Sequence, residues 1–221
     1  MPRLEEAIVN HLGKRSSCAP WLRYEDDPAV HSPVVHFEYP AAERGGFDYL
    51  RREVKLELGS LTDQQPTGRH AIRAWAVEDS PAAFADWDCQ VTALELSRTF
   101  WEKATILHAE HHRPAEQPTP GRYARHYSDM ARLLGHADAQ AMLEDHTLCA
   151  RVVAWKDRVF ARQWARYDLA KRGTFRLLPP QARCAALARD YAQMRPMFLS
   201  APPDFDAVLA TLEAAERAIN R

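Results

Sequence analysis

The segment LSRTFWEKATILHAEHHR, residues 96–113, decides the fold, because the spacing of hydrophobic residues changes there from that of strands to that of a helix. Phe100, Ala104 and Leu107 recur at intervals of four and three residues and form one stripe. Trp101, Thr105 and His108 form a second stripe on the adjacent face, so the segment predicts an amphipathic helix. Basic residues lie toward its start and histidines toward its end. The segment therefore raises two chemical hypotheses, a phosphate site and a metal site.

Short runs before this segment predict strands, because they are rich in β-branched or aromatic residues and are separated by Gly, Pro, Asp and Ser. The runs are residues 34–39, 49–58, 69–77 and 89–94. Residues 3–14 predict a short amphipathic helix, and residues 16–33 predict a loop rich in Asp and Pro.

Helical spacing dominates after residue 96. The expected helices are residues 118–135, 138–165, 180–198 and 204–220, the last with Asp204 as its N-cap. We predict an α+β fold in which residues 1–95 form a small mixed sheet of about four strands and residues 96–221 form a helical bundle.

Composition limits the class of protein. The 221 residues include 29 basic and 30 acidic residues, so a uniformly basic nucleic-acid coat is not expected, although local basic patches are. No apolar run of about 18 residues occurs, so we expect no signal peptide and no membrane span. The four cysteines form no C-x-x-C pair, which favours a reduced, cytoplasmic setting.

Glu57 is the first candidate for chemistry. Strand alternation in VKLELGS, residues 54–60, places it between the apolar Leu56 and Leu58, and a rigid strand is a good mount for a metal-binding carboxylate. The alternative is a solvated outer face with Lys55 and Glu57 as neighbouring charges.

The start of the 96–113 helix is the second candidate. Ser97 or Thr99 could cap it, and free N–H groups at a helix N-terminus favour anions. Arg98 and Lys103 near that end oppose the helix dipole, which makes simple charge decoration a poorer explanation. We predict a triphosphate site with Arg98, Thr99 and Lys103. The alternative is solvated basic side chains.

The histidines give a third hypothesis, since His108 and His112 at i and i+4 could share a zinc ion. The H-E-x-x-H pattern needs a glutamate at position 109, where Ala109 stands. We therefore favour histidines that hydrogen-bond to their neighbours.

Two further segments carry clustered charge. Arg122, Arg125 and Asp129 are spaced to lie on one side of the helix expected at residues 118–135. Arg122 and Arg125 are predicted phosphate ligands beside Asp129, which could accept a proton or bind metal. An Arg125–Asp129 helical salt bridge is the alternative. Residues 164–179 interleave basic and aromatic side chains, so Arg166, Arg172 and Arg176 are predicted RNA contacts, and a plain surface loop is the alternative.

Six ordered blocks of this sequence resemble the nucleotidyltransferase AbiEii/AbiGii toxin family of abortive-infection and type IV toxin–antitoxin systems. The blocks are YLRREVKLELGS, RTFWEKATILHAEHHRP, RYARHYSDMARL, WARYDLAKRGTFRLLPP, RDYAQM and PDFDAVLATLEAAERAIN. The resemblance implies a polymerase-β-type fold in which a small sheet binds Mg²⁺ through carboxylates and a helical half helps to hold the nucleoside triphosphate.

The resemblance also implies roles for three residues. Glu57 matches the third carboxylate of the superfamily and is the implied metal ligand. Lys103 matches the family lysine, an implied phosphate contact, and Asp129 matches the acidic residue of the last motif. All three are implied catalytic residues.

The sequence departs from the family pattern in two ways. The last motif is often two aspartates three apart, and His126 stands at the earlier position. Residues 1–60 hold neither the Gly-rich turn that grips the triphosphate nor the Asp-x-Asp that holds two metals. We therefore expect the chain to be an N-terminally truncated form with a remnant of the sheet and with little or no activity.

Three functional hypotheses remain open. The first is a toxin that transfers a nucleotide from a nucleoside triphosphate, with Mg²⁺, to RNA, with tRNA as the expected acceptor. The second is a non-catalytic protein that binds nucleoside triphosphate, RNA or a cognate antitoxin. The third is a zinc hydrolase built on His108 and His112.

Overall fold

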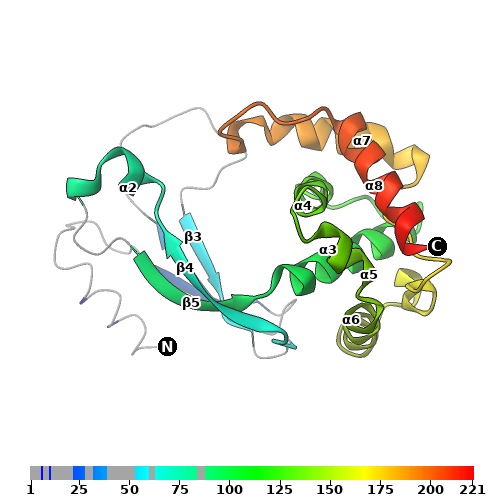
Figure 1. Cartoon of the computed structure of the whole chain (residues 1–221), viewed down its shortest axis with the longest axis horizontal. Helices are drawn as coiled ribbons and strands as arrows, with labels where there is room; N and C mark the ends of the chain where they lie inside the picture. The colour runs from blue at the N-terminus through cyan, green and yellow to red at the C-terminus, as the bar shows by residue number, and fades with distance from the viewer. Residues whose placement is uncertain are drawn as a thin grey trace. The chain divides into compact units, whose positions relative to one another are not determined.

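The computed structural model describes residues 22–27, 32–38, 53–59, 63–83 and 88–221, together with Glu6 and Asn10. The chain divides into two compact units, Met1–Thr62 and Asp63–Arg221. Five strands in two antiparallel sheets precede a helical region (Figure 1), so the predicted α+β class is confirmed. The sheets are antiparallel rather than mixed. Apart from Glu6 and Asn10, the helix expected at residues 3–14 lies outside the described residues.

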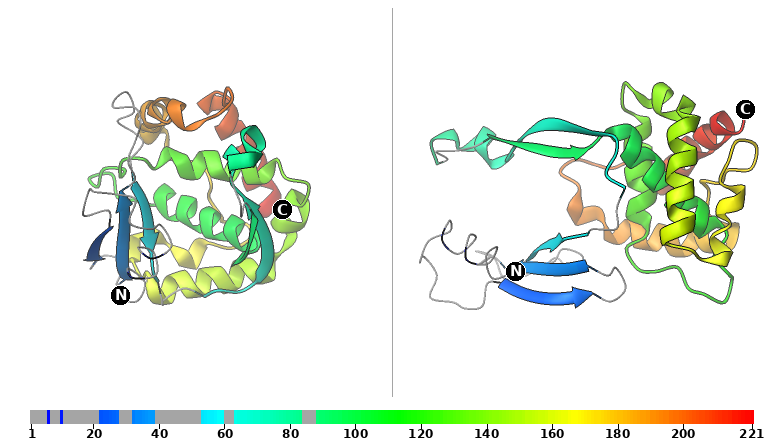
Figure 2. Two further views of the ribbon diagram at one scale, coloured as in Figure 1. Left: turned by 90° about the vertical axis from the view of Figure 1, so that its left-hand side faces the viewer. Right: turned by 90° about the horizontal axis from the view of Figure 1, so that it is seen from below.

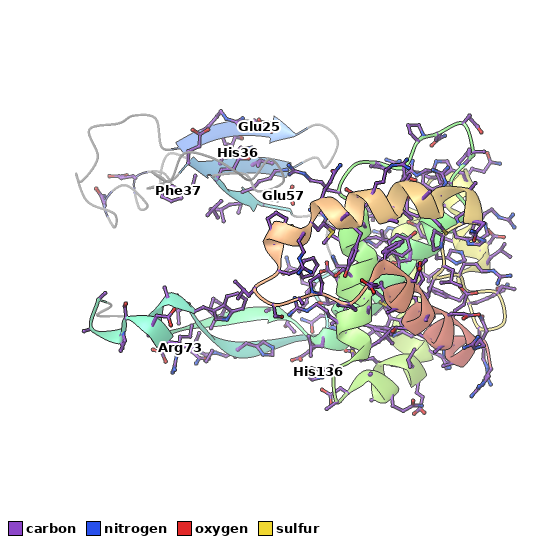
Figure 3. All side chains as sticks on the ribbon, turned by 90° about the horizontal axis from the view of Figure 1, so that it is seen from above. Glu25, His36, Phe37, Glu57, Arg73 and His136 are labelled. Carbon is purple, nitrogen blue, oxygen red and sulfur yellow. The ribbon has the colours of Figure 1, made fainter. Side chains whose placement is uncertain are left out.

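The first unit contains a three-stranded sheet of β1 (Leu22–Asp27), β2 (Ser32–Glu38) and β3 (Glu53–Glu57), in that order. Strand β2 lies in the middle, and its Val34, Val35 and His36 are buried. The His36 ring lies 3.0 Å from a carboxylate oxygen of Glu53. Figure 3 labels His36 on this sheet.

Strand β1 corrects the prediction of a loop at residues 16–33. Its residues LRYEDD are mostly charged, and charged residues have low strand propensity. Six residues nevertheless pair in register with β2, from Leu22 opposite Phe37 to Asp27 opposite Ser32. Pairing with the buried central strand therefore overrides the local propensity of this segment.

The second unit begins with a two-stranded ribbon of β4 (Thr67–Arg73) and β5 (Asp88–Leu94). Helix α2 (Ala76–Asp79) and the 3₁₀ turn η1 (Pro81–Ala83) lie between the two strands in the sequence. The strand expected at residues 69–77 therefore ends early, at Arg73. Strand β5 leads directly into helix α3, as Figure 1 shows.

The helices of the second unit form its core (Figure 2). They are α3 (Leu96–His111), α4 (Ala124–Leu134), α5 (Ala139–Glu144), α6 (His146–Val159), α7 (Gln181–Gln193) and α8 (Phe205–Ile219), with the 3₁₀ turns η2 (Gln163–Ala165), η3 (Tyr167–Leu169) and η4 (Arg195–Met197). Helix α3 packs against α4 and α6, and α4 packs against α7 and α8.

The single helix expected at residues 138–165 is two helices, because Asp145 interrupts it. The φ and ψ angles of Asp145, −79° and 69°, are not helical. Its side chain instead accepts a hydrogen bond of 2.9 Å from the backbone N–H of Leu148. Asp145 is thus the N-cap of α6, a role that its short carboxylate suits.

Helix α3 is buried on most of its circumference, and the buried surface includes both of the adjacent stripes that the sequence indicated. Phe100, Trp101, Ala104 and Leu107 have no exposed surface. The Trp101 ring meets Phe100 edge-on, with ring centroids 5.0 Å apart, and Phe175 at 5.8 Å. A helix that is buried in this way is central to its unit rather than a surface element.

A buried ion-pair network links α3 to the segment before β4 and to α6. The Arg98 guanidinium, with no exposed surface, donates to the Asp63 carboxylate at 2.8 Å and to that of Glu102 at 2.6 Å. It also donates to the backbone oxygen of Gln65 at 2.8 Å. On α6, Arg151 binds Asp63 at 2.8 Å and Lys156 binds Glu102 at 2.5 Å.

His108 connects α3 to the chain between η2 and α7. Its Nδ1 accepts a 3.0 Å hydrogen bond from the backbone N–H of Arg176, so Nε2 carries the proton and donates to the Arg166 oxygen at 3.0 Å. This arrangement requires the neutral ring. Burial lowers the pKa of His108 to about 4, from an ordinary value of 6.5, although the bond to Arg166 raises it.

No helix among the described residues is both long and apolar enough to cross a membrane.

We expect Arg98→Met to lower the free energy of unfolding by about 3–5 kcal/mol, because Asp63 and Glu102 would lose their shared buried cation. Arg151→Met is the matched control. Its side chain is 51 % exposed and pairs with the same Asp63, so a loss of about 1 kcal/mol or less is expected. Urea unfolding measures both. Equal losses for the two variants would contradict the central role of Arg98.

We expect the unfolding free energy to fall as the pH is lowered from about 6.5 to about 4. In this window the unfolded chain binds a proton at residue 108 and the folded chain does not, which amounts to about 3 kcal/mol when complete. Urea unfolding at a series of pH values measures the slope. His108→Gln should reduce it, and His146→Gln, at an exposed position, should leave it unchanged. Equal slopes for wild type and His108→Gln would refute this origin.

Candidate functional site

Lys103 and Asp129 meet in the second unit. Lys103 lies on α3 and Asp129 on α4, and Nζ of the lysine donates to Oδ2 of the aspartate at 2.7 Å. The side chains are 22 % and 45 % exposed, so both can be reached from solvent. The structure thus brings together two residues that were predicted from separate segments, 26 residues apart.

His126 completes this group, which we call the lysine cluster (Lys103, His126 and Asp129). Its Nδ1 lies 3.2 Å from Nζ of Lys103. An ammonium group has only donors, so Nδ1 accepts and the ring is the neutral Nε2–H tautomer. Burial first, and then the charges of Lys103 and Arg125, lower the pKa of His126 to about 4.

The prediction for the start of α3 is wrong in its capping. Glu95 is the N-cap of α3, and no side-chain capping bond is recorded there, so neither Ser97 nor Thr99 caps the helix. The Thr99 N–H donates to the Glu95 oxygen at 3.1 Å. Lys103 lies about two turns inside the helix, beyond the first four free N–H groups. The lysine cluster, rather than the helix dipole, therefore determines the surroundings of Lys103.

Arg98, in the first turn of α3, points into the protein interior. All of its recorded guanidinium hydrogen bonds go to Asp63, Gln65 and Glu102, and no part of the side chain is exposed. A phosphate would have to displace one of these carboxylates. The geometry therefore favours a structural role for Arg98 over the predicted phosphate contact.

Arg122 does not share a helix face with Arg125 and Asp129, because α4 begins after it, at Ala124. Its φ of +64° is left-handed, and its backbone N–H donates to Oδ1 of Asp190 at 3.0 Å. The expected alignment of three side chains on one helix is therefore wrong. Arg125 lies on α4 and is exposed, and the recorded ion pair of Asp129 is with Lys103 rather than with Arg125.

The three predicted RNA contacts each have a partner within the protein. Arg166 forms two hydrogen bonds of 2.9 Å with the Asp168 carboxylate. Arg176 pairs with Glu216 at 3.1 Å, and Arg172 donates to the backbone oxygen of Arg221. Much of the positive charge that the sequence indicated here is therefore compensated.

Glu57 lies on β3 in the first unit, 56 % exposed and 2.5 Å from Nζ of Lys55. Val54, Leu56 and Leu58 are also exposed, so the apolar side chains that flank Glu57 do not form a buried face in the described part of the unit. A magnesium ion requires several oxygen ligands around one point. Across the described ranges, no three His, Cys, Asp or Glu residues are placed to hold a metal ion. Glu57 is therefore not part of a three-residue metal cluster in the described part of the chain.

The zinc hypothesis fails on the same histidines that suggested it. A zinc ligand needs a free nitrogen lone pair, and both ring nitrogens of His108 are engaged by backbone groups. Nδ1 of His111 lies 2.7 Å from the Leu178 oxygen, which is also a structural contact.

A cavity of about 180 Å³ lies beside Tyr123, whose ring contacts His126 of the lysine cluster, and it was not predicted from the sequence. We call it the recess. Its lining includes Arg113, Tyr123, Lys156, Phe160, Arg162 and Trp164. These side chains come from the turn after α3, the residue before α4, the end of α6 and the segment from there through η2. The clustering of basic and aromatic residues at 155–164 was the one local signal, and the more distant members could not be found from spacing.

Comparison with protein families gave one match: the family model described as nucleotidyl transferase AbiEii toxin, type IV toxin–antitoxin system, matches residues 3–211. No curated protein and no solved structure matches the chain.

We expect NMR of ¹⁵N-labelled histidine to show His126 as the Nε2–H tautomer with a pKa of about 4. Lys103→Met should raise this pKa, because a nearby positive charge that opposes protonation is removed. Asp129→Asn should lower it further, because the carboxylate favours the charged ring. A lower pKa of His126 in Lys103→Met, or a higher one in Asp129→Asn, would contradict the assigned contacts.

Proposed function

The chain belongs to the AbiEii toxin family of nucleotidyl transferases of type IV toxin–antitoxin systems, and from this premise we propose that it transfers a nucleotide from a nucleoside triphosphate to RNA. A tRNA is the proposed acceptor and the cytoplasm the proposed location. The observation that carries the proposal is the contact of Lys103 with Asp129, because it joins two sequence blocks that resemble the family.

In this proposal Lys103 binds phosphate oxygens of the nucleotide. An ammonium group is a compact point charge with three donors, and two of them are used by Asp129 and His126. The third donor and the exposed fraction of the side chain leave room for one phosphate oxygen. Asp129 and His126 are positioning residues, since they fix the ammonium without consuming it.

Magnesium is part of the proposal only as a requirement to be tested. The family resemblance implies metal-binding carboxylates, with Glu57 as one of them. Residues 1–60 hold no Asp-x-Asp tripeptide, but Asp86, Trp87 and Asp88 form one in the sequence, and Asp88 is the first residue of β5. The exposed side chain of Asp88 is therefore a further candidate carboxylate.

The alternative is a non-catalytic protein that binds nucleoside triphosphate, RNA or an antitoxin. The lack of the Gly-rich turn in residues 1–60 favours this alternative, because that turn grips the triphosphate in the family.

The test is transfer of label from each nucleoside triphosphate to total tRNA, with Mg²⁺ and with a chelator. We expect incorporation that Lys103→Ala lowers by about 100-fold or more, because a charge stabilising the transferred phosphoryl group is removed. Asp88→Asn and Glu57→Gln test the carboxylates. Arg217→Ala, on the exposed face of α8, should have no effect. Nucleotide binding without incorporation by the wild type would support the alternative.

A further inference from the structure

The recess is lined by positive charge. Arg113, Lys156 and Arg162 line it together with one carboxylate, Glu110. Glu110 accepts two hydrogen bonds from Arg113, at 2.7 Å and 2.6 Å, and both side chains are nearly buried. Their pairing cancels their charges, and Lys156 pairs with Glu102 outside the lining, so Arg162 sets the sign. The recess therefore suits an anionic ligand.

Arg162 is the cation with the most freedom to bind a ligand. Lys156 is held by Glu102 at 2.5 Å. Arg162 is exposed, lies 5.8 Å from the centroid of the Trp164 ring, and has no carboxylate partner among the described residues. Unlike Arg166 and Arg176, which pair with Asp168 and Glu216, its guanidinium is available to an external anion.

The walls of the recess are aromatic. The Arg113 guanidinium lies over Trp164, 4.6 Å from the ring centroid, and the Lys156 ammonium lies 5.0 Å from that of Phe160. Phe160 is 46 % exposed although it is a large apolar residue. Exposed aromatic rings beside cations are the arrangement that binds nucleobases by stacking and phosphates by charge.

The recess is connected to the lysine cluster through one ring contact. The ring of Tyr123, which lines the recess, meets His126 edge-on with centroids 4.9 Å apart. His126 in turn contacts Lys103. A volume of about 180 Å³ is smaller than the roughly 300–1,000 Å³ of most small-molecule pockets. The recess therefore has room for one part of a ligand, and the rest of that ligand would lie outside it.

We propose that the recess binds one nucleotide, with its base against the exposed face of Phe160 and its phosphates between Arg162 and Lys103. The inference rests on the proposed function in that Lys103 is taken as a phosphate contact. It adds the site of the base, for which the family resemblance implied no residues. The nucleotide belongs either to free nucleoside triphosphate or to an end of the RNA acceptor, and the test separates the two.

Calorimetric titration of the full chain tests the inference. The probes are the four nucleoside triphosphates and a short single-stranded RNA without a 5′-phosphate. Arg162→Glu should weaken binding by about tenfold or more through charge reversal, and Phe160→Ala by about tenfold through lost stacking. Both side chains are exposed, so folding should be retained. Weakening confined to the triphosphates assigns the free nucleotide, and weakening confined to RNA assigns the acceptor.

Arg158→Glu is the matched control. Arg158 is exposed on α6, lies over Trp155 at 5.5 Å and is not part of the recess, so its reversal should change affinity by less than about twofold. Equal effects of Arg158→Glu and Arg162→Glu would overturn the inference, as would unchanged binding in both recess variants or no binding by the wild type.

The transfer assay separates this inference from the proposed function. Binding that depends on Arg162 and Phe160 without any transfer leaves the inference standing and removes the enzyme. Transfer that depends on Lys103, together with normal binding by the recess variants, supports the proposed function and removes the inference about the recess.

Discussion

The buried guanidinium of Arg98 is the constraint on which the second unit depends. A charge without exposed surface must keep its carboxylates close, and here they come from the segment before β4 and from α3 itself. Arg151 and Lys156 extend the network to α6. The change in the spacing of hydrophobic residues at residues 95–96 therefore separates strands from helices, but it does not separate two independent folding units, because the Arg98–Asp63 ion pair crosses it. A fragment beginning at residue 96 would keep Arg98 and lose Asp63.

Periodicity predicted the elements whose own residues decide their structure. The order of the helices in residues 96–221 was predicted correctly, because an apolar stripe such as Phe100, Ala104 and Leu107 becomes buried regardless of which segment comes before it. Strand β1 was missed because its charged sequence has no strand pattern, and only its pairing with β2, from Leu22 opposite Phe37 to Asp27 opposite Ser32, makes it a strand. The break at Asp145 was missed because a short carboxylate can cap a helix or simply occupy one, and only the bond to Leu148 distinguishes the two.

The part of the candidate site that was proposed from the sequence is the lysine and the carboxylate of the lysine cluster. Lys103 and Asp129 were identified by the resemblance, and their contact is a property of helix packing that spacing does not contain. The roles of the arginines could not be decided from the sequence, because a guanidinium serves equally well inside an ion-pair network and on a ligand surface. Residues of the recess are brought together by packing of α3 against α6, so no stretch of sequence displays them as a set.

His126 places a neutral imidazole where the family motif often has a second, negatively charged aspartate. Two aspartates beside Lys103 would give the lysine cluster a net negative charge, whereas a neutral imidazole and Asp129 leave it balanced. A balanced cluster repels a polyanion less than a negative one does, and it attracts divalent cations less strongly. If the cluster binds phosphate as proposed, the neutral imidazole of His126 favours direct contact between Lys103 and the phosphate over contact through a bound cation.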